Sequence, residues 1–135
     1  DESIKTARDL KLAIQIGAIK ILNLKPARVG GFTESLKIYE VCVENNLPLW
    51  VGGMLETGVG RAATLSFASL PGVTMPSDIS ATDRYYDPDI TEPAFKLGEG
   101  STLSVVDAPG IGVTVQRARL EEAAARWVED NPYGG

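Results

Sequence analysis

The 135-residue sequence contains no histidine, a single cysteine and no long hydrophobic run. Without histidine, the chain lacks the usual ligands of a catalytic zinc site and the general base of a Ser-His-Asp triad. The lone Cys42 excludes an internal disulfide framework and fits a reducing cytoplasm, which is the location we expect. No apolar stretch approaches the roughly 20 residues that cross a bilayer, so we expect no membrane partner. Any catalysis must therefore depend on carboxylates, lysines or backbone groups.

The composition itself is that of a folded domain, with 44% hydrophobic and 23% charged residues. The length allows one ordinary domain with a sizeable core. A net charge of −5 argues against a nucleic-acid partner, because phosphate binding needs clustered lysines and arginines. The chain starts at Asp1 with neither an initiator methionine nor a signal peptide, and we expect that further sequence precedes it.

Predicted helices and strands alternate along the first part of the chain. The spacing of apolar residues predicts one helix between Ser3 as N-cap and Gly17, and further helices at about 32–44 and 58–69. Short apolar runs at 19–24, 47–51 and 73–75 predict buried strands. An alternation with a repeat of about 25 residues is typical of βα units around a parallel sheet. Both a doubly wound sheet and part of a (β/α)₈ barrel fit this pattern.

The pattern changes after Asp78. Residues 78–99 are polar and rich in Asp, Pro and Tyr, which predicts a long loop that is either solvated or a lid over a substrate. Short strands are predicted at 102–105 and 112–115, on either side of a turn at Pro109 and Gly110. A last helix has an apolar face, and residues 131–135 are predicted to be a frayed tail. The residues of that face are Leu120, Ala123, Ala124 and Trp127.

The candidate site residues follow the predicted strands, because ligands bind at the carboxyl ends of parallel strands. Lys25 is the most informative, since it ends an apolar strand. A partly desolvated lysine in that place acts as a base or stabilises an anion, whereas the alternative is a lysine that simply extends into solvent. Gly52 and Gly53 allow either a close approach of the backbone to a ligand or a tight turn.

Three other features have two interpretations each. Asp1 and Glu2 are either metal ligands or carboxylates favoured near the start of a helix. Glu56 and Arg61 are close enough in sequence to pair with each other. The run from Gly58 to Ala63 fits the G-x-G-x-x-A dinucleotide fingerprint, but six residues separate it from the preceding strand, so we set dinucleotide binding aside.

Four blocks, taken together and in order, resemble the signature segments of the o-succinylbenzoate synthases and N-acylamino acid racemases, which belong to the muconate lactonizing enzyme subgroup of the enolase superfamily. The resemblance extends from Asp1 to about Gly112. It is more specific than any single motif and favours the functional interpretation of Lys25. The blocks are D-E-S at 1–3, N-L-K-P-A-R-V-G-G at 23–31, G-G-M-L-E-T-G-V-G-R-A at 52–62 and S-D-I-S at 77–80.

The resemblance implies an α/β fold, the C-terminal half of a (β/α)₈ barrel. Residues 1–88 would run from the end of the fifth strand to the eighth, and residues 89–135 would return to the capping domain. It also implies a Mg²⁺-dependent enzyme that removes the proton α to a carboxylate of a small-molecule substrate through an enediolate. Asp1 would be a metal ligand and Lys25 a catalytic residue. Gly53, Met54, Leu55 and Asp78 would contact the substrate.

The remaining parts of the family's site have no counterpart in this sequence. They are the K-x-K lysine of the second barrel strand and two further metal ligands. We therefore expect this chain to be inactive alone, and to be marginally stable or to associate where its sheet edges lack partners. The complete enzyme is expected to be a homo-oligomer. Synthase and racemase activities are not separable from these residues, and a non-catalytic βα binding module is the alternative from another functional class.

Overall fold

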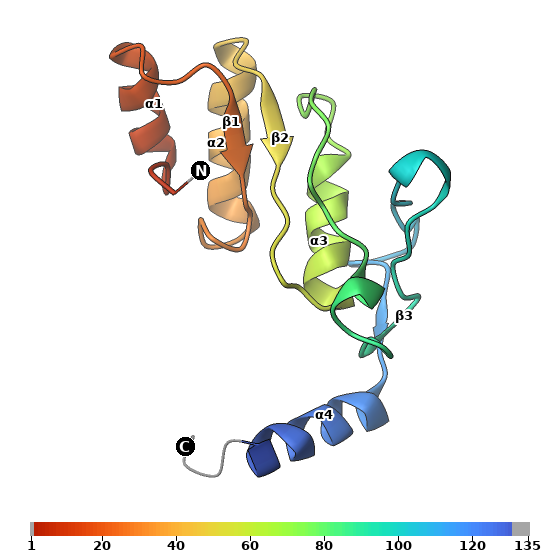
Figure 1. Cartoon of the computed structure of the whole chain (residues 1–135). Coiled ribbons are helices and arrows are strands. Elements are labelled where there is room, and N and C mark those ends of the chain that lie inside the picture. Colours follow the sequence, from red (N-terminus) through yellow and green to blue (C-terminus); the bar gives the residue numbers. More distant parts are fainter. Residues whose placement is uncertain (1, 131–135) are drawn as a thin grey trace.

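Two short parallel strands lie at the centre of the main core in the computed structural model, which describes residues 2–130. They are β1 (Leu22–Leu24) and β2 (Leu49–Val51), and Asn23 lies opposite Trp50 in their register. Helices α1 (Ala7–Gln15), α2 (Phe32–Glu44) and α3 (Gly58–Ala68) share one core with this sheet (Figure 1). The parallel pairing across a helical connection confirms the predicted βα units.

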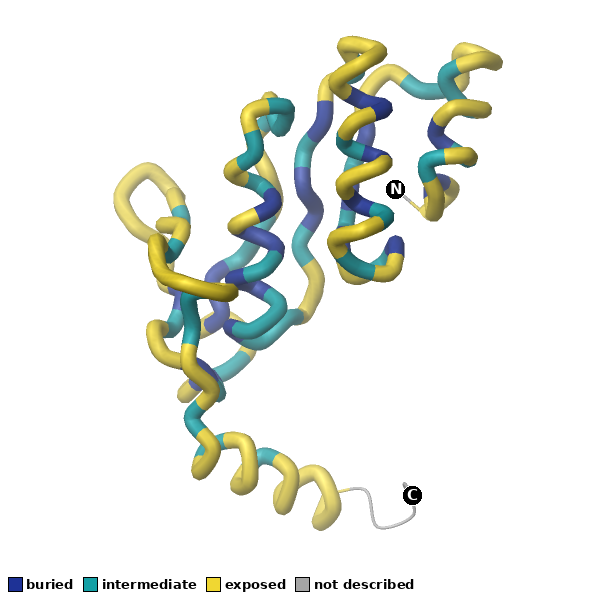
Figure 2. Tube along the Cα trace, turned by 180° about the vertical axis from the view of Figure 1, so that it is seen from behind, coloured by how far each residue is buried: buried dark blue, intermediate teal, exposed yellow. Residues whose placement is uncertain are grey.

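The main hydrophobic core lies between one face of the two strands and the three helices. Leu22, Leu24, Leu49 and Val51 are buried, whereas the residues between them are only partly covered. Because side chains alternate across a strand, one face of the sheet is packed against helices and the opposite face is left open. Figure 2 shows this as dark segments in the strands and along the helix sides that face them. The helices contribute Leu10, Ile38, Val41, Cys42 and Phe67.

The thiol of Cys42 lies inside this core, where burial raises its pKa to about 11. The thiolate is the reactive form, so we expect iodoacetamide at pH 8 to label Cys42 far more slowly in the folded protein than in guanidinium chloride. Mass spectrometry of the peptide containing Cys42 measures both rates. Equal labelling rates with and without denaturant would contradict the packing described above.

The start of α1 differs from the prediction that Ser3 caps it. The N-cap is Thr6, whose hydroxyl accepts from the Asp9 N–H at 3.2 Å, while the Asp9 carboxylate accepts from the Thr6 N–H at 2.9 Å. These bonds, that to the Thr6 side chain first, hold the pKa of Asp9 below its usual value. The reciprocal capping box satisfies two helix-end donors and so determines the start of the helix. Gly17, with φ +67°, ends it as predicted.

Residues 73–75 do not form the predicted strand, although they run beside β2. The N–H groups of Thr74 and Met75 both donate to the carbonyl of Leu49, at 3.1 and 3.3 Å, so a regular ladder does not form. The direction of the chain there is nevertheless that of a third parallel segment next to β2 (Figure 1).

The segment from residue 78 onward is mostly irregular, as predicted, with 3₁₀ turns η1 (Thr82–Arg84) and η2 (Glu99–Ser101). The pairing of its strands was not predicted. β3 (Thr91–Glu92) pairs antiparallel with β4 (Thr114–Val115), and residues 102–105 form no strand. Instead, apolar side chains of that stretch join a small second core. This core contains Ala62, Leu65 and Phe95, with Leu103, Val106 and Val113 packed against it.

Helix α4 (Arg117–Asp130) projects away from the other elements (Figure 1). It has no buried residue, and its predicted apolar face is exposed, with Trp127 at 64%. The predicted tail at 131–135 lies outside the described residues. No helix in residues 2–130 has the length and apolar character needed to span a membrane.

Candidate functional site

Lys25 stands at the carboxyl end of β1, directly after the buried Leu24. The alternation along the strand places its side chain on the open face of the sheet, away from the helices. The side chain is 20% exposed, and its Nζ lies 3.9 Å from Oε1 of Glu2. The other oxygen of Glu2 lies 3.8 Å from Nε of Arg28. Lys25 is therefore a largely buried cation at the mouth of the sheet, where its charge is less screened by water than on the open surface.

Gly52 follows β2 on the same face and lets Lys25 lie flat against the backbone. A Cβ atom at position 52 would stand 2.8 Å from both Cγ and Cε of Lys25 and would collide with the side chain of Asn23. The N–H of Gly52 also donates to the carbonyl of Leu24 at 2.8 Å. Glycine is needed here for the close approach of the lysine stem, so the site depends on this position although Gly52 has no side chain to react.

Gly53 and Asp78 connect the ends of two neighbouring parallel segments. The N–H of Gly53 donates to Oδ1 of Asp78 at 2.7 Å. Asp78 is exposed, so its carboxylate is available to solvent while it holds this loop. A side chain at position 53 would also press on Arg61, whose Nη1 would lie 3.1 Å from the added Cβ.

These residues surround one hollow of about 480 Å³. The structure thus brings Lys25 together with all four residues predicted to contact a substrate, although they come from three separate segments of the sequence. Met54 and Leu55 present apolar side chains there that are 43% and 70% exposed. Asp1, the predicted metal ligand, lies outside the described residues. The lining residues are Lys25, Gly53, Met54, Leu55, Asp78, Ser80, Arg84 and Tyr85.

Glu56 and Arg61 form the pair that the sequence suggested. Nη1 of Arg61 lies 3.0 Å from Oε2 of Glu56, and the arginine side chain is fully buried. Its Nη2 donates to the carbonyl of Met54 at 2.9 Å, and Oε1 of Glu56 accepts from the hydroxyl of Thr64 at 3.0 Å. Because α3 begins at Gly58, this buried pair attaches the loop after β2 to the first turns of that helix.

Two contacts of the irregular segment were not visible in the sequence. The hydroxyl of Tyr86 donates to the carbonyl of Leu55 at 2.8 Å. The buried carboxylate of Asp89 accepts from the N–H of Gly58 at 3.1 Å, at the amino end of α3, where a negative charge is favoured. The composition of residues 78–99 left open a solvated loop or a lid over a substrate, and it did not indicate that Tyr86 and Asp89 bond to the backbone of residues 55 and 58.

The acidic residues of the described part of the chain could supply some ligands of a metal site, but not a complete set. Within residues 2–130, no three His, Cys, Asp or Glu side chains are grouped closely enough to hold a metal ion. Mg²⁺ prefers oxygen ligands, and the carboxylate of Glu2, 3.9 Å from Nζ of Lys25, is one such group at this place. Any Mg²⁺ site here would therefore need further carboxylates from outside this part of the chain.

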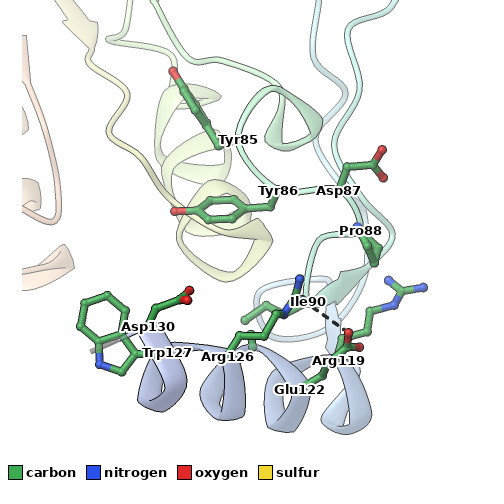
Figure 3. A pocket seen from close by; sticks show the side chains of 11 residues that line it. Tyr85, Tyr86, Asp87, Pro88, Ile90, Arg119, Glu122, Arg126, Trp127 and Asp130 are labelled. Carbon is green, nitrogen blue, oxygen red and sulfur yellow. Dashed lines mark ion pairs between the residues drawn. The ribbon is translucent and has the colours of Figure 1, made fainter. Parts of the chain in front are cut away.

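A second hollow, of about 380 Å³, separates α4 from residues 85–90 (Figure 3). Its two arginines are already engaged. Arg119 contacts Glu92 at 2.8 Å and donates to the carbonyl of Asp89, and Arg126 lies 3.7 Å from Glu122. Figure 3 shows Arg119, Glu122 and Arg126 in a row along α4, with Arg126 paired to Glu122. These charged groups therefore lie along one helix and do not come from several strand ends as around Lys25.

Comparison with known proteins gives a consistent result. Residues 1–119 match the family described as Enolase C-terminal domain-like. The chain is 48% identical over 130 residues to an N-succinylamino acid racemase of an Amycolatopsis species, covering 95% of this chain and 35% of that protein. It is 49% identical over 117 residues to the o-succinylbenzoate synthase of Bacillus subtilis, covering 87% of this chain and 31% of that protein.

The fold is also shared with solved structures. A member of the enolase superfamily from Listeria innocua superposes with a TM-score of 0.85 at 43% identity, over 90% of this chain and 33% of that one. The chain therefore spans about a third of the length of the relatives that it matches. The α/β fold predicted from the sequence, part of an enolase-type barrel, is confirmed.

Proposed function

Because this chain belongs to the enolase C-terminal domain-like family, we propose that it supplies one side of an active site that removes the proton α to a carboxylate. The substrate class is an N-acylamino acid or the non-aromatic ring precursor of an aromatic succinyl acid. The similar proteins carry two names, N-succinylamino acid racemase and o-succinylbenzoate synthase. We propose that both activities would begin with the same proton removal.

The observation that carries this proposal is the position of Lys25. It combines an amine at the carboxyl end of a barrel-type strand, partial burial and a place in the hollow with Met54, Leu55 and Asp78. Barrel enzymes carry out their chemistry at this end of the strands. A lysine that merely extended into solvent would not need the contact surface that Gly52 provides.

In the proposed racemisation, Nζ of Lys25 accepts the α-proton of one enantiomer or returns a proton to the same face of the α-carbon. In the proposed dehydration, the ammonium form stabilises the negative charge of the enediolate by cation–π contact. A bound Mg²⁺ would stabilise negative charge that develops on the substrate carboxylate. Gly53, Met54 and Leu55 face the acyl or succinyl part, and Asp78 fixes the loop that presents them.

The opposite face of the α-carbon requires a second base. We propose that it belongs to a K-x-K lysine in the part of the complete protein that corresponds to the other two-thirds of the relatives. "Complete protein" here means the polypeptide that joins this chain to that part. The open face of β1 and β2 and the exposed apolar face of α4 are surfaces that this part would cover. We propose the division between barrel and capping segment near residue 88.

An activity assay distinguishes the proposed enzyme from a non-catalytic binding module. The complete protein is incubated with N-succinyl amino acids and, separately, with the synthase precursor, and the products are followed by polarimetry and ultraviolet absorbance. Turnover of either substrate that stops on addition of a chelator and returns with Mg²⁺ supports the proposal. Binding of these acids without any turnover supports the binding module instead.

Asp1 is proposed to be one of the Mg²⁺ ligands. In the complete protein, we expect Asp1→Asn to weaken Mg²⁺ binding and to lower turnover by at least about 10-fold, since amide oxygens carry no charge to balance the cation. Isothermal titration with Mg²⁺ measures the affinity independently of activity. Lys5→Gln, which removes a charge at an exposed residue four positions along the sequence, is the control. Wild-type metal affinity in Asp1→Asn would remove Asp1 from the ligand set.

A further inference from the structure

We propose that Arg61 and Tyr86 are positioning residues that determine which acyl group the site accepts. The inference rests on the proposed function and concerns the loop of residues 53–55, called here the acyl loop. Neither side chain lines the hollow around Lys25. Each instead holds a backbone carbonyl of the acyl loop from outside.

The two carbonyls are successive. Nη2 of Arg61 donates to the carbonyl of Met54 at 2.9 Å, and the hydroxyl of Tyr86 donates to the carbonyl of Leu55 at 2.8 Å. The peptide groups on both sides of Leu55 are therefore fixed in orientation. Since the bond from Cα to Cβ follows from the orientation of the flanking peptides, these two hydrogen bonds fix the direction in which the Leu55 side chain leaves the backbone.

The amino end of the acyl loop is fixed as well, by the bond from the N–H of Gly53 to Asp78 at 2.7 Å. Three segments thus hold three successive residues: α3, the extended chain beside β2 and the irregular segment after η1. These three bonds restrain the backbone, while the side chains of Met54 and Leu55 remain exposed at 43% and 70%. An apolar wall on a fixed backbone discriminates between ligands by shape, whereas a mobile loop would adapt to several.

The arginine is suited to this role by its geometry. Its fork lets Nη1 stay 3.0 Å from Glu56 while Nη2 reaches the Met54 carbonyl, so the buried charge and the loop contact are separate functions of one side chain. A lysine at this position keeps a cation near Glu56 but does not reach both groups at once. Arg61→Lys therefore weakens the loop contact selectively, and Tyr86→Phe removes a single hydroxyl.

The test compares two substrates that share one amino acid and differ in the acyl group, N-succinyl and N-acetyl. In the complete protein, we expect Tyr86→Phe to lower the ratio of kcat/KM for N-succinyl over N-acetyl by roughly three- to tenfold, as the loss of one hydrogen bond allows. The change should occur in KM, with kcat within about twofold, because the α-carbon and Lys25 are unaffected. Arg61→Lys should move the ratio in the same direction.

Tyr39→Phe is the matched control. The hydroxyl of Tyr39 accepts from the N–H of Gly72 at 3.2 Å. Tyr39→Phe therefore loses the same oxygen atom and one hydrogen bond to the backbone, as Tyr86→Phe does, but at a place away from the hollow. The ratio should stay at its wild-type value in this variant. A ratio unchanged in Tyr86→Phe, in an enzyme that remains active, would overturn the inference alone. A wild-type protein that turns over only the synthase precursor would overturn this inference but not the proposed function. A wild-type protein that turns over neither the acylamino acids nor the synthase precursor would overturn both.

Discussion

Replacing Lys25 by methionine in the complete protein is expected to lower kcat by roughly 10²- to 10⁴-fold, the usual contribution of a general acid–base group. Methionine retains a stem that packs on Gly52 but has no amine. KM should change little for a substrate held mainly by its acyl part and the metal. Steady-state kinetics with N-succinyl amino acids measures both constants.

Lys20→Met is the control for this prediction. Lys20 is an exposed lysine just before β1, so it undergoes the same chemical change at the far end of the same stretch. Its variant should keep wild-type kinetics and the same melting temperature as Lys25→Met. A Lys25→Met enzyme with kcat within threefold of the wild type would exclude a proton-transfer role for this residue.

Glu56→Gln is expected to lower the free energy of unfolding by about 3–5 kcal/mol, because breaking a buried pair leaves an uncompensated charge. The penalty applies in full to Arg61, because its side chain is completely buried and water cannot solvate the unpaired charge. Glutamine can still accept from the hydroxyl of Thr64, so the effect reports the charge and not the lost hydrogen bond. Urea unfolding of the complete protein, followed by circular dichroism, gives the value.

The double variant Glu56→Gln with Arg61→Met separates the energy of the Glu56–Arg61 interaction from the contributions of the surrounding residues. With the arginine removed, Glu56→Gln should cost less than about 1 kcal/mol, the level expected when no buried charge is left unpaired. Equal costs in the presence and absence of Arg61 would show that the two residues are not energetically coupled, and that the pair does not hold the loop as described.

The sequence predicted the barrel-type part of the fold because its local signals agree with one another. The apolar runs ending at Leu24 and Val51 are strands, and helical spacing located α2 and α3 to within a residue or two. The grouping of the candidate residues was predicted by the same rule, since residues that follow parallel segments of the chain meet at one edge. Lys25 and Asp78 share a hollow for that reason.

The contacts made by the irregular segment could not be predicted from local sequence patterns. Nothing in the run of Asp, Pro and Tyr after residue 78 indicates that Tyr86 bonds Leu55 or that Asp89 is buried at the start of α3. These contacts depend on how a long loop folds back over distant elements. The missed pairing of β3 with β4 has the same cause, because each strand has only two residues and so no periodicity to detect.

Hydrogen–deuterium exchange at the α-carbon tests the central claim most directly. The complete protein is incubated in D₂O with each pure enantiomer of an N-succinyl amino acid, and the loss of the α-proton signal is followed by NMR. The wild type should exchange both enantiomers. Lys25→Met should lose exchange with one enantiomer by at least about 100-fold and retain it with the other, because only one of two opposed bases is removed. Equal exchange of both enantiomers by Lys25→Met would contradict the placement of this lysine at the reacting carbon.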